Sequence, residues 1–180
     1  MTVALKRPAP ATGPDFAAIF SEHAPFVLRV LRHLGVPGAD LQDQAQEVFL
    51  AVFRGLEGFE GRSALRTWVY GICVRVASNH RRRAYVRRER SVSEPPEQAL
   101  EPDQPRALEE GRGWPGLRRL LDTLDPDKRD VFVLYELEEL PMREVAEACG
   151  CPLQTAYSRL HAARRVLLEK YREQELNDER

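Results

Sequence analysis

The sequence predicts an all-α protein made of two small helical domains. Apolar residues recur at intervals of three and four along most of the 180-residue chain, and no run alternates apolar and polar residues for long enough to indicate a strand. Five prolines and six acidic residues give the stretch 91–115 the composition of a linker. We therefore expect a tail at 1–14, a first domain at 15–90, this acidic Pro-rich linker at 91–115, a second domain at 116–173 and a tail at 174–180.

The first domain is expected to begin with two amphipathic helices. Asp15 is the expected N-cap of the first, which ends at the glycines of 35–38, and the second runs from near Asp40 to about Arg54. Acidic residues at the start of the second helix suit the positive end of its dipole. The apolar stripes expected to face the core contain Phe16, Ile19, Phe20, Val27, Val30, Leu31, Leu34, Leu41, Ala45, Val48, Phe49, Val52 and Phe53.

A glycine-rich loop separates these helices from a long third helix. Ser63 is the expected N-cap of this helix, which continues into an arginine-rich segment at 81–88. An aromatic side chain beside a positively charged helix can stack on an unpaired base, which contributes about 1–3 kcal/mol per base. Trp68 is in register with the apolar stripe and is expected to be half-buried, whereas Phe59 in the loop and Tyr70 off the stripe are better stacking candidates.

The second domain is expected to end in a helix-turn-helix. Asp125 is the expected N-cap of its second helix, and Gly150 and Pro152 interrupt the pattern before its last, basic helix. A helix-turn-helix places the N-terminal side chains of its second helix at base edges in the major groove. Helical periodicity covers 116–124, 126–139, 141–149 and 153–172. The side chains expected to face duplex DNA are Gln154, Thr155, Tyr157, Ser158, Arg159, His161, Arg164 and Arg165.

The net charge of −1 conceals a strong segregation of charge. Residues 61–90 contain nine Arg and one acidic residue, and residues 148–172 contain five basic residues and one acidic residue, whereas the neighbouring segments are acidic. A single arginine run is most often a solvated helix face, but two separate basic segments suit an extended polyanion that is neutralised at several phosphates. We therefore expect a nucleic-acid partner.

No catalytic or metal-binding pattern is present in the sequence. The three cysteines, Cys73, Cys149 and Cys151, do not form a zinc-ligand set with the four histidines, and there is no nucleotide-binding glycine loop or nucleophile elbow. We therefore expect a protein that is not an enzyme and needs no cofactor. No apolar run is long enough for a membrane span and the N-terminus lacks a secretory apolar region, so we expect no membrane insertion and a cytoplasmic location.

Several segments resemble the bacterial RNA polymerase sigma factors of the sigma-70 family. Residues 40–50 read DLQDQAQEVFL, residues 59–70 read FEGRSALRTWVY and residues 79–83 read NHRRR, and together they resemble region 2 of these proteins. Residues 145–165 read VAEACGCPLQTAYSRLHAARR and resemble region 4. Because no other segment resembles the additional regions of larger sigma factors, the chain is similar to the extracytoplasmic-function group.

The resemblance implies a subunit that binds core RNA polymerase, recognises two promoter elements and assists melting. It implies contacts with the β and β′ subunits, the β′ contact being made by an acidic helix at Asp43, Gln46 and Glu47. Minus-10 contacts, which include capture of a flipped base by the loop, are implied at Phe59, Arg62, Ser63, Arg66, Trp68, Tyr70, Asn79, Arg81 and Arg82. Minus-35 contacts fall on the helix-turn-helix residues named above. Since relatives are often held by an anti-sigma factor, such a partner is also implied.

Two other functions compete with this interpretation. One is a helix-turn-helix regulator that binds duplex DNA without polymerase, and the other is a helical adaptor with no nucleic-acid role. The two basic segments disfavour the adaptor. The first domain disfavours the regulator, because a protein that binds only duplex DNA needs no acidic helix ahead of a base-capturing loop. The sequence therefore favours a sigma factor.

Overall fold

The computed structural model describes residues 16–91 and 114–178, and every regular element in those ranges is helical. The expected all-α fold is confirmed there, while the expected cap Asp15 and most of the linker lie outside the described residues. The N-terminal unit comprises α1 (Phe16–His33), α2 (Leu41–Gly55) and α3 (Leu65–Ser91), with short turns η1 (Gly38–Asp40) and η2 (Leu56–Gly58). The C-terminal unit comprises α4 (Trp114–Leu121), α5 (Pro126–Phe132), η3 (Val133–Leu137), α6 (Met142–Ala148) and α7 (Leu153–Asp178).

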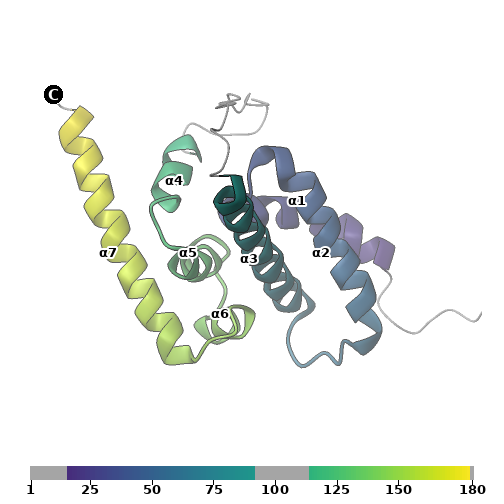
Figure 1. The fold of residues 1–180 in the computed structure, drawn as a ribbon. Helices are drawn as coiled ribbons and strands as arrows, with labels where there is room; N and C mark the ends of the chain where they lie inside the picture. The colour runs from purple at the N-terminus through teal and green to yellow at the C-terminus, as the bar shows by residue number, and fades with distance from the viewer. Residues whose placement is uncertain (1–15, 92–113, 179–180) are drawn as a thin grey trace, which may run out of the picture.

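The two units pack directly against each other. Helix α3 lies beside α6 and contacts it, α1 and α2 cover the other side of α3, and α7 packs on α5 and α6 (Figure 1). The outer edges of the molecule are therefore α1 and α2 on one side and α7 on the other (Figure 1). The helix expected to bind polymerase and the helix expected to read duplex DNA lie at opposite ends of the structure.

Helix α1 ends in a Schellman motif that leaves room for a side chain from the other unit. The N–H of Val36 donates to the carbonyl of Leu31 at 3.0 Å, and the N–H of Gly35 donates to that of Arg32 at 3.1 Å. Gly35 has φ +93, and a Cβ there would lie 2.8 Å from Nη1 of Arg129 on α5. A glycine is needed here both for the backbone conformation and for the close approach of this guanidinium.

Helix α3 begins one residue later than its expected cap implies. Its first hydrogen bond joins the N–H of Trp68 to the carbonyl of Ala64 at 3.1 Å, so Ala64 and not Ser63 is the N-cap. The preceding loop extends to this point because Gly61 adopts a left-handed φ of +70. Ser63 is left half-buried in the loop.

The expected start of α5 is confirmed, and the expected end of α7 is wrong. Asp125 caps α5, because its Oδ1 accepts a hydrogen bond from the N–H of Lys128 at 3.1 Å. Helix α7 continues past Arg172 to Asp178, through five residues that were expected to be tail. Glu, Gln and Leu dominate this extension, and these residues have high helix propensity.

Candidate polymerase and nucleic-acid interfaces

The acidic face of α2 is open to solvent. Asp43, Gln46 and Glu47 are all exposed, whereas Leu41, Ala45, Val48, Phe49 and Val52 on the same helix are buried. Because buried and exposed positions alternate at helical spacing, the three polar side chains share one outward stripe. The structure thus brings together the three residues expected to contact polymerase.

An apolar groove between α1 and α2 adjoins this stripe. It has a volume of about 540 Å³, and Asp43 and Gln46 form part of its lining. Phe20 and Phe53 were expected in the core, but 47% and 61% of their surfaces are exposed at the groove. They lie there because the aromatic rings pack on one another, with centroids 4.6 Å apart for Phe20 and Phe49. Periodicity alone could not distinguish this open face from a buried one.

The loop before α3 presents the side chains expected to capture a base. Phe59 is half-buried and packs on Trp68, with ring centroids 5.0 Å apart. Trp68 is itself half-buried, as expected. Arg62 is exposed and its Nε lies 2.9 Å from a carboxylate oxygen of Glu60. These residues and the half-buried Ser63 lie in the loop and at the start of α3.

Tyr70 lies in a different place from the one expected. Its expected position off the apolar stripe is wrong, because the side chain is fully buried. Its hydroxyl donates to Oε2 of Glu138 at 2.7 Å, and Nη2 of Arg66 donates to the same hydroxyl at 3.0 Å. The ring packs on Phe26 of its own unit, with centroids 5.1 Å apart, and Glu138 of the C-terminal unit binds the hydroxyl.

The remaining basic face of α3 is only partly free. Asn79 and Arg82 are exposed. Arg81 donates from Nη1 to the carbonyl of Leu34 at 2.8 Å and from Nη2 to Asp130 of α5 at 2.9 Å. The structure therefore divides the expected minus-10 residues of α3 into an exposed group and a group held by the C-terminal unit.

Helices α6 and α7 form a helix-turn-helix whose turn is a second Schellman motif. The N–H of Cys151 donates to the carbonyl of Ala146 at 3.0 Å, and that of Gly150, with φ +61, donates to Glu147 at 3.1 Å. The carbonyl of Pro152 accepts the first hydrogen bond of α7. The expected glycine turn is confirmed.

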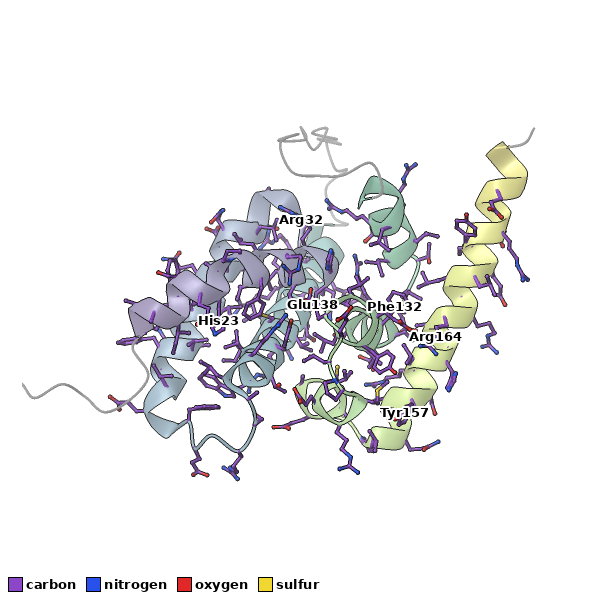
Figure 2. The ribbon with its side chains drawn as sticks, turned by 180° about the vertical axis from the view of Figure 1, so that it is seen from behind. His23, Arg32, Phe132, Glu138, Tyr157 and Arg164 are labelled. Carbon is purple, nitrogen blue, oxygen red and sulfur yellow. The ribbon has the colours of Figure 1, made fainter. Side chains whose placement is uncertain are left out.

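Helix α7 presents an outward ridge of the expected recognition residues. Ala156, Leu160 and Ala163 are buried against the other helices of the unit. The opposite face carries side chains at intervals of three and four, all exposed: Gln154, Ser158, His161 and Arg165. Tyr157, labelled near the start of α7 in Figure 2, is exposed beside this ridge.

The other recognition residues lie nearer to the rest of the unit. Thr155 is half-buried. Arg159 forms an ion pair with Asp127 of α5, and Arg164 donates to Glu136 at 2.6 Å while its guanidinium lies 5.8 Å from the ring centre of Tyr135. These arginines can move to phosphate only by leaving acidic partners. The ridge is therefore better placed for immediate contact with duplex DNA.

A group of charged side chains that no sequence pattern marks lies between the two units. Glu138, labelled near the middle of Figure 2, is buried. It accepts bidentate hydrogen bonds from Nε and Nη2 of Arg29 at 3.1 and 2.8 Å. Burial alone would raise the pKa of Glu138, but hydrogen bonds from Arg29 and Tyr70 outweigh burial and hold that pKa below its ordinary value. Glu138 follows the π-helical turn η3, a local distortion that no pattern in the sequence marks.

The described residues contain neither a metal-binding cluster nor a helix suited to a membrane. No cluster of His, Cys, Asp or Glu in the described residues could hold a metal ion. No helix in the described ranges is both long and apolar enough to cross a membrane. Cys73 is buried, and Cys149 and Cys151 are half-buried against the core as free thiols.

An exposed acidic helix, an arginine-rich helix behind an aromatic loop and a helix-turn-helix define a DNA-binding transcription protein. The chain matches the family described as Sigma-70 region 2 over residues 19–87 and the family described as Sigma-70, region 4 over residues 116–167. The ECF RNA polymerase sigma-E factor of Escherichia coli strain K12 is 32% identical over 145 residues, which cover 75% of each chain. The probable RNA polymerase sigma-C factor of Mycobacterium bovis is 30% identical over 145 residues, covering 79% of this chain and 75% of that protein.

Two solved structures share the fold. The sigma factor RpoE of Bartonella quintana, solved with the anti-sigma factor NepR, has a TM-score of 0.68 at 22% identity over 86% of this chain and 95% of that one. CnrH, solved with the cytosolic domain of CnrY, has a TM-score of 0.64 at 21% identity over 88% of each chain.

This chain belongs to the extracytoplasmic-function group of the sigma-70 family of RNA polymerase sigma factors. It therefore directs promoter-specific initiation of transcription by RNA polymerase. The alternative of a regulator that acts without polymerase is not favoured, because the relatives that share both of its regions are sigma factors.

Proposed function

We propose that this chain docks on core RNA polymerase, on its β and β′ subunits, with the α2 stripe as the β′ contact. Asp43, Gln46 and Glu47 are exposed together beside an apolar groove. A surface that combines an apolar centre with a charged rim suits a protein partner with a complementary basic rim. The exposure of this stripe, in a chain whose other half carries a helix-turn-helix, is the observation that carries the proposal.

The proposed minus-10 contacts lie on the loop and on α3. Phe59 and Trp68 offer stacking surfaces, and Arg62, Ser63 and Asn79 offer hydrogen bonds to an extruded base or its neighbouring phosphates. The cationic side chains of α3 that are assigned to the same element are Arg66, Arg81 and Arg82. Tyr70 is assigned to this set as well, and it must leave its buried position to reach DNA.

The proposed minus-35 contacts lie on α7. The outward ridge supplies base contacts, with Tyr157 and Thr155 beside it, and Arg165 lies about three turns from Gln154, where it meets phosphate. Arg159 and Arg164 join these contacts when they exchange their carboxylate partners for phosphate. Such phosphate contacts would make the affinity for duplex DNA fall with rising salt.

The protein is proposed to act in the cytoplasm as a non-catalytic specificity subunit. An anti-sigma factor is a further proposed partner, because two proteins of the same fold were solved in complex, one with the anti-sigma factor NepR and the other with the cytosolic domain of CnrY. No cofactor is included in the proposal.

Run-off transcription with purified core enzyme tests the proposal. We expect promoter-dependent transcripts only when this chain is added. Asp43→Lys with Glu47→Lys should weaken binding to core at least about tenfold, since each reversal replaces an attraction by a repulsion. Glu22→Lys with Glu57→Lys, at exposed positions outside the stripe, is the matched control for charge. Equal losses in both variants would remove the stripe from the polymerase interface.

A second experiment tests α7. Arg165→Ala should reduce affinity for minus-35 duplex and lower the salt slope by about one counterion. Arg172→Ala, exposed further along the same helix, is the matched control. An unchanged slope for Arg165→Ala would contradict its assignment to phosphate.

A further inference from the structure

Helix α7 carries two large apolar side chains that its own unit leaves uncovered. Leu168 and Tyr171 are 51% and 50% exposed, and α7 is the outermost helix on its side of the molecule (Figure 1). Both residues lie beyond residue 167, where the match to region 4 ends, so the promoter contacts proposed for α7 do not account for them. Two exposed apolar side chains are a small patch, and the charges around them decide what it fits.

A charged residue lies on each side of this apolar pair. Arg164 precedes Leu168 by four residues, and Glu175 follows Tyr171 by four. The resulting spacing of four, three and four residues is that of a coiled-coil seam and places the four side chains on one stripe of the helix. All four are exposed. We call these four residues the α7 seam, which has a cation at one end, an anion at the other and apolar side chains between them.

We propose that the α7 seam binds the α7 seam of a second copy of this chain, with the two helices antiparallel. In that orientation Arg164 of one copy lies opposite Glu175 of the other, and Leu168 lies opposite Tyr171, because both pairs are centred on the same point of the helix. A parallel pair would bring the two Arg164 side chains together, and likewise the two Glu175 side chains, which like-charge repulsion disfavours. The seam is therefore complementary to itself in one orientation.

The apolar and the charged residues of the seam contribute in different ways. Burial of Leu168 and Tyr171 supplies the affinity, since exposed ion pairs contribute little to it. The ion pairs instead set the orientation and the register. The seam covers about three turns of helix, whereas stable interfaces bury about 1,200–2,000 Å². We therefore expect an association that depends on concentration and not a permanent dimer.

Pairing through the seam would involve one residue of the proposed minus-35 set. Nε of Arg164 donates to Glu136 of its own unit at 2.6 Å, and 48% of the Arg164 side chain remains exposed. The exposed part is available to a carboxylate of the second copy. A chain paired in this way cannot give the same guanidinium to phosphate. This consequence rests on the proposed function, whereas the pairing itself does not.

Sedimentation equilibrium of the full chain tests the pairing. Raising the concentration from about 5 µM to about 0.5 mM should increase the weight-average mass at least about 1.5-fold above the 20.6 kDa of one chain. Arg164→Glu places like charges opposite each other at both ends of the seam, and so does Glu175→Arg, so each variant alone should stay monomeric. An equimolar mixture of the two variants restores both opposite-charge contacts and should associate as the wild-type chain does.

Matched controls separate the seam from charge in general. Arg143→Glu and Glu169→Arg make the same charge changes at exposed positions outside the seam, and each variant should associate as the wild-type chain does. Leu168→Ser with Tyr171→Ser removes the apolar centre and should abolish association. Circular dichroism checks that every variant folds. If Arg164→Glu does not fold, Glu175→Arg and the double serine variant decide the question.

The outcomes that would overturn the inference are distinct. A wild-type chain that stays monomeric at the highest concentration would show that no second copy covers Leu168 and Tyr171, and the face would then belong to another partner such as core polymerase. Association that Glu175→Arg and the double serine variant both retain would place the contact elsewhere on the chain. A mixture of folded Arg164→Glu and Glu175→Arg chains that stays monomeric would overturn the antiparallel register. None of these results depends on polymerase or promoter DNA.

Discussion

Helices α3 and α7 both carry many arginines, yet the acidic residues that hold some of these arginines come from different parts of the fold. The ridge of α7 points to solvent, and Arg165 at its C-terminal end is exposed. On α3, Arg81 is held by Asp130 and the carbonyl of Leu34, while its neighbour Arg82 is exposed. Both helices therefore combine exposed arginines with arginines held by carboxylates. The carboxylate that holds Arg81 belongs to the other unit, whereas those that hold Arg159 and Arg164 of α7 belong to the same unit. Whether a basic helix is available to DNA depends on which acidic residues the tertiary fold places beside it.

The largest expected effect is a difference in unfolding free energy between substitutions at two neighbouring arginines of α3, one held by a carboxylate and one exposed. Arg81→Ala leaves the buried Asp130 without its bidentate partner, and breaking a buried pair in this way costs about 3 kcal/mol of unfolding free energy. Arg82→Ala, one residue away and exposed, should change it by less than about 0.5 kcal/mol. Urea denaturation of both variants makes the comparison, and equal effects would show that the two side chains have the same surroundings.

The contrast between these helices also shows what the sequence can and cannot predict. Asp125, Gly150 and the periodic apolar residues of α7 carry local signals, and the elements they predict are present. The pairing of Tyr70 with Glu138 joins residues 68 positions apart, and no local pattern marks it. Periodicity assigns a residue to a face of a helix. It does not tell which neighbour covers that face.

The same limit explains the errors at Phe20 and Phe53. Both lie on the apolar stripes of α1 and α2, and both stripes do face a neighbouring helix for most of their length. At the ends of these stripes no third helix within the described ranges covers the rings, so an apolar groove remains. For the proposed polymerase contact the sequence predicted the polar residues Asp43, Gln46 and Glu47, and missed the apolar surface beside them. The residue type alone does not show whether an aromatic side chain is exposed or buried.

A second test addresses the glycine that admits Arg129 to the interface. Gly35→Val should reduce the unfolding free energy by about 2 kcal/mol, because a β-branched residue is strained at φ +93 and its Cβ would lie 2.8 Å from Nη1 of Arg129. Gly58→Val is the control, since a Cβ there meets nothing within 4 Å. Denaturant midpoints measure both. A loss at Gly35 no greater than at Gly58 would contradict the close approach of the units.

The buried imidazole of His33, at the end of α1, predicts that the stability of the fold depends on pH. Burial lowers the pKa of His33 to about 4, against the attraction of Glu138, and three nearby arginines lower it further. Because this pKa lies below the ordinary value of 6.5, the neutral ring stabilises the fold above about pH 6.5, and that contribution is lost as the pH falls toward 4. One proton is taken up, so the slope from His33 is at most about 1.4 kcal/mol per pH unit.

Substitution isolates this contribution. His33→Gln keeps a neutral side chain at every pH, so the difference in stability between wild type and variant should shrink as the pH is lowered from 6.5 to 4. His161→Gln, on the exposed ridge of α7, should leave the acid-dependent loss in place. Urea denaturation at several pH values provides the measurement, and parallel curves for wild type and His33→Gln would contradict the burial of a neutral ring.

The smallest effect is expected at the hydroxyl of Tyr70. Tyr70→Phe keeps the ring, whose centre lies 5.1 Å from that of Phe26, and removes the hydroxyl with its hydrogen bond to Glu138 and the one it accepts from Arg66. Because Arg29 still holds that carboxylate, the loss should be about 1 kcal/mol. Tyr157→Phe, on the open face of α7, should change stability by less than about 0.5 kcal/mol. Urea denaturation of both variants measures these losses. Equal losses would show that the hydrogen bond from Tyr70 to Glu138 adds nothing to stability, and that the covered face of α3 is held by its ion pairs alone.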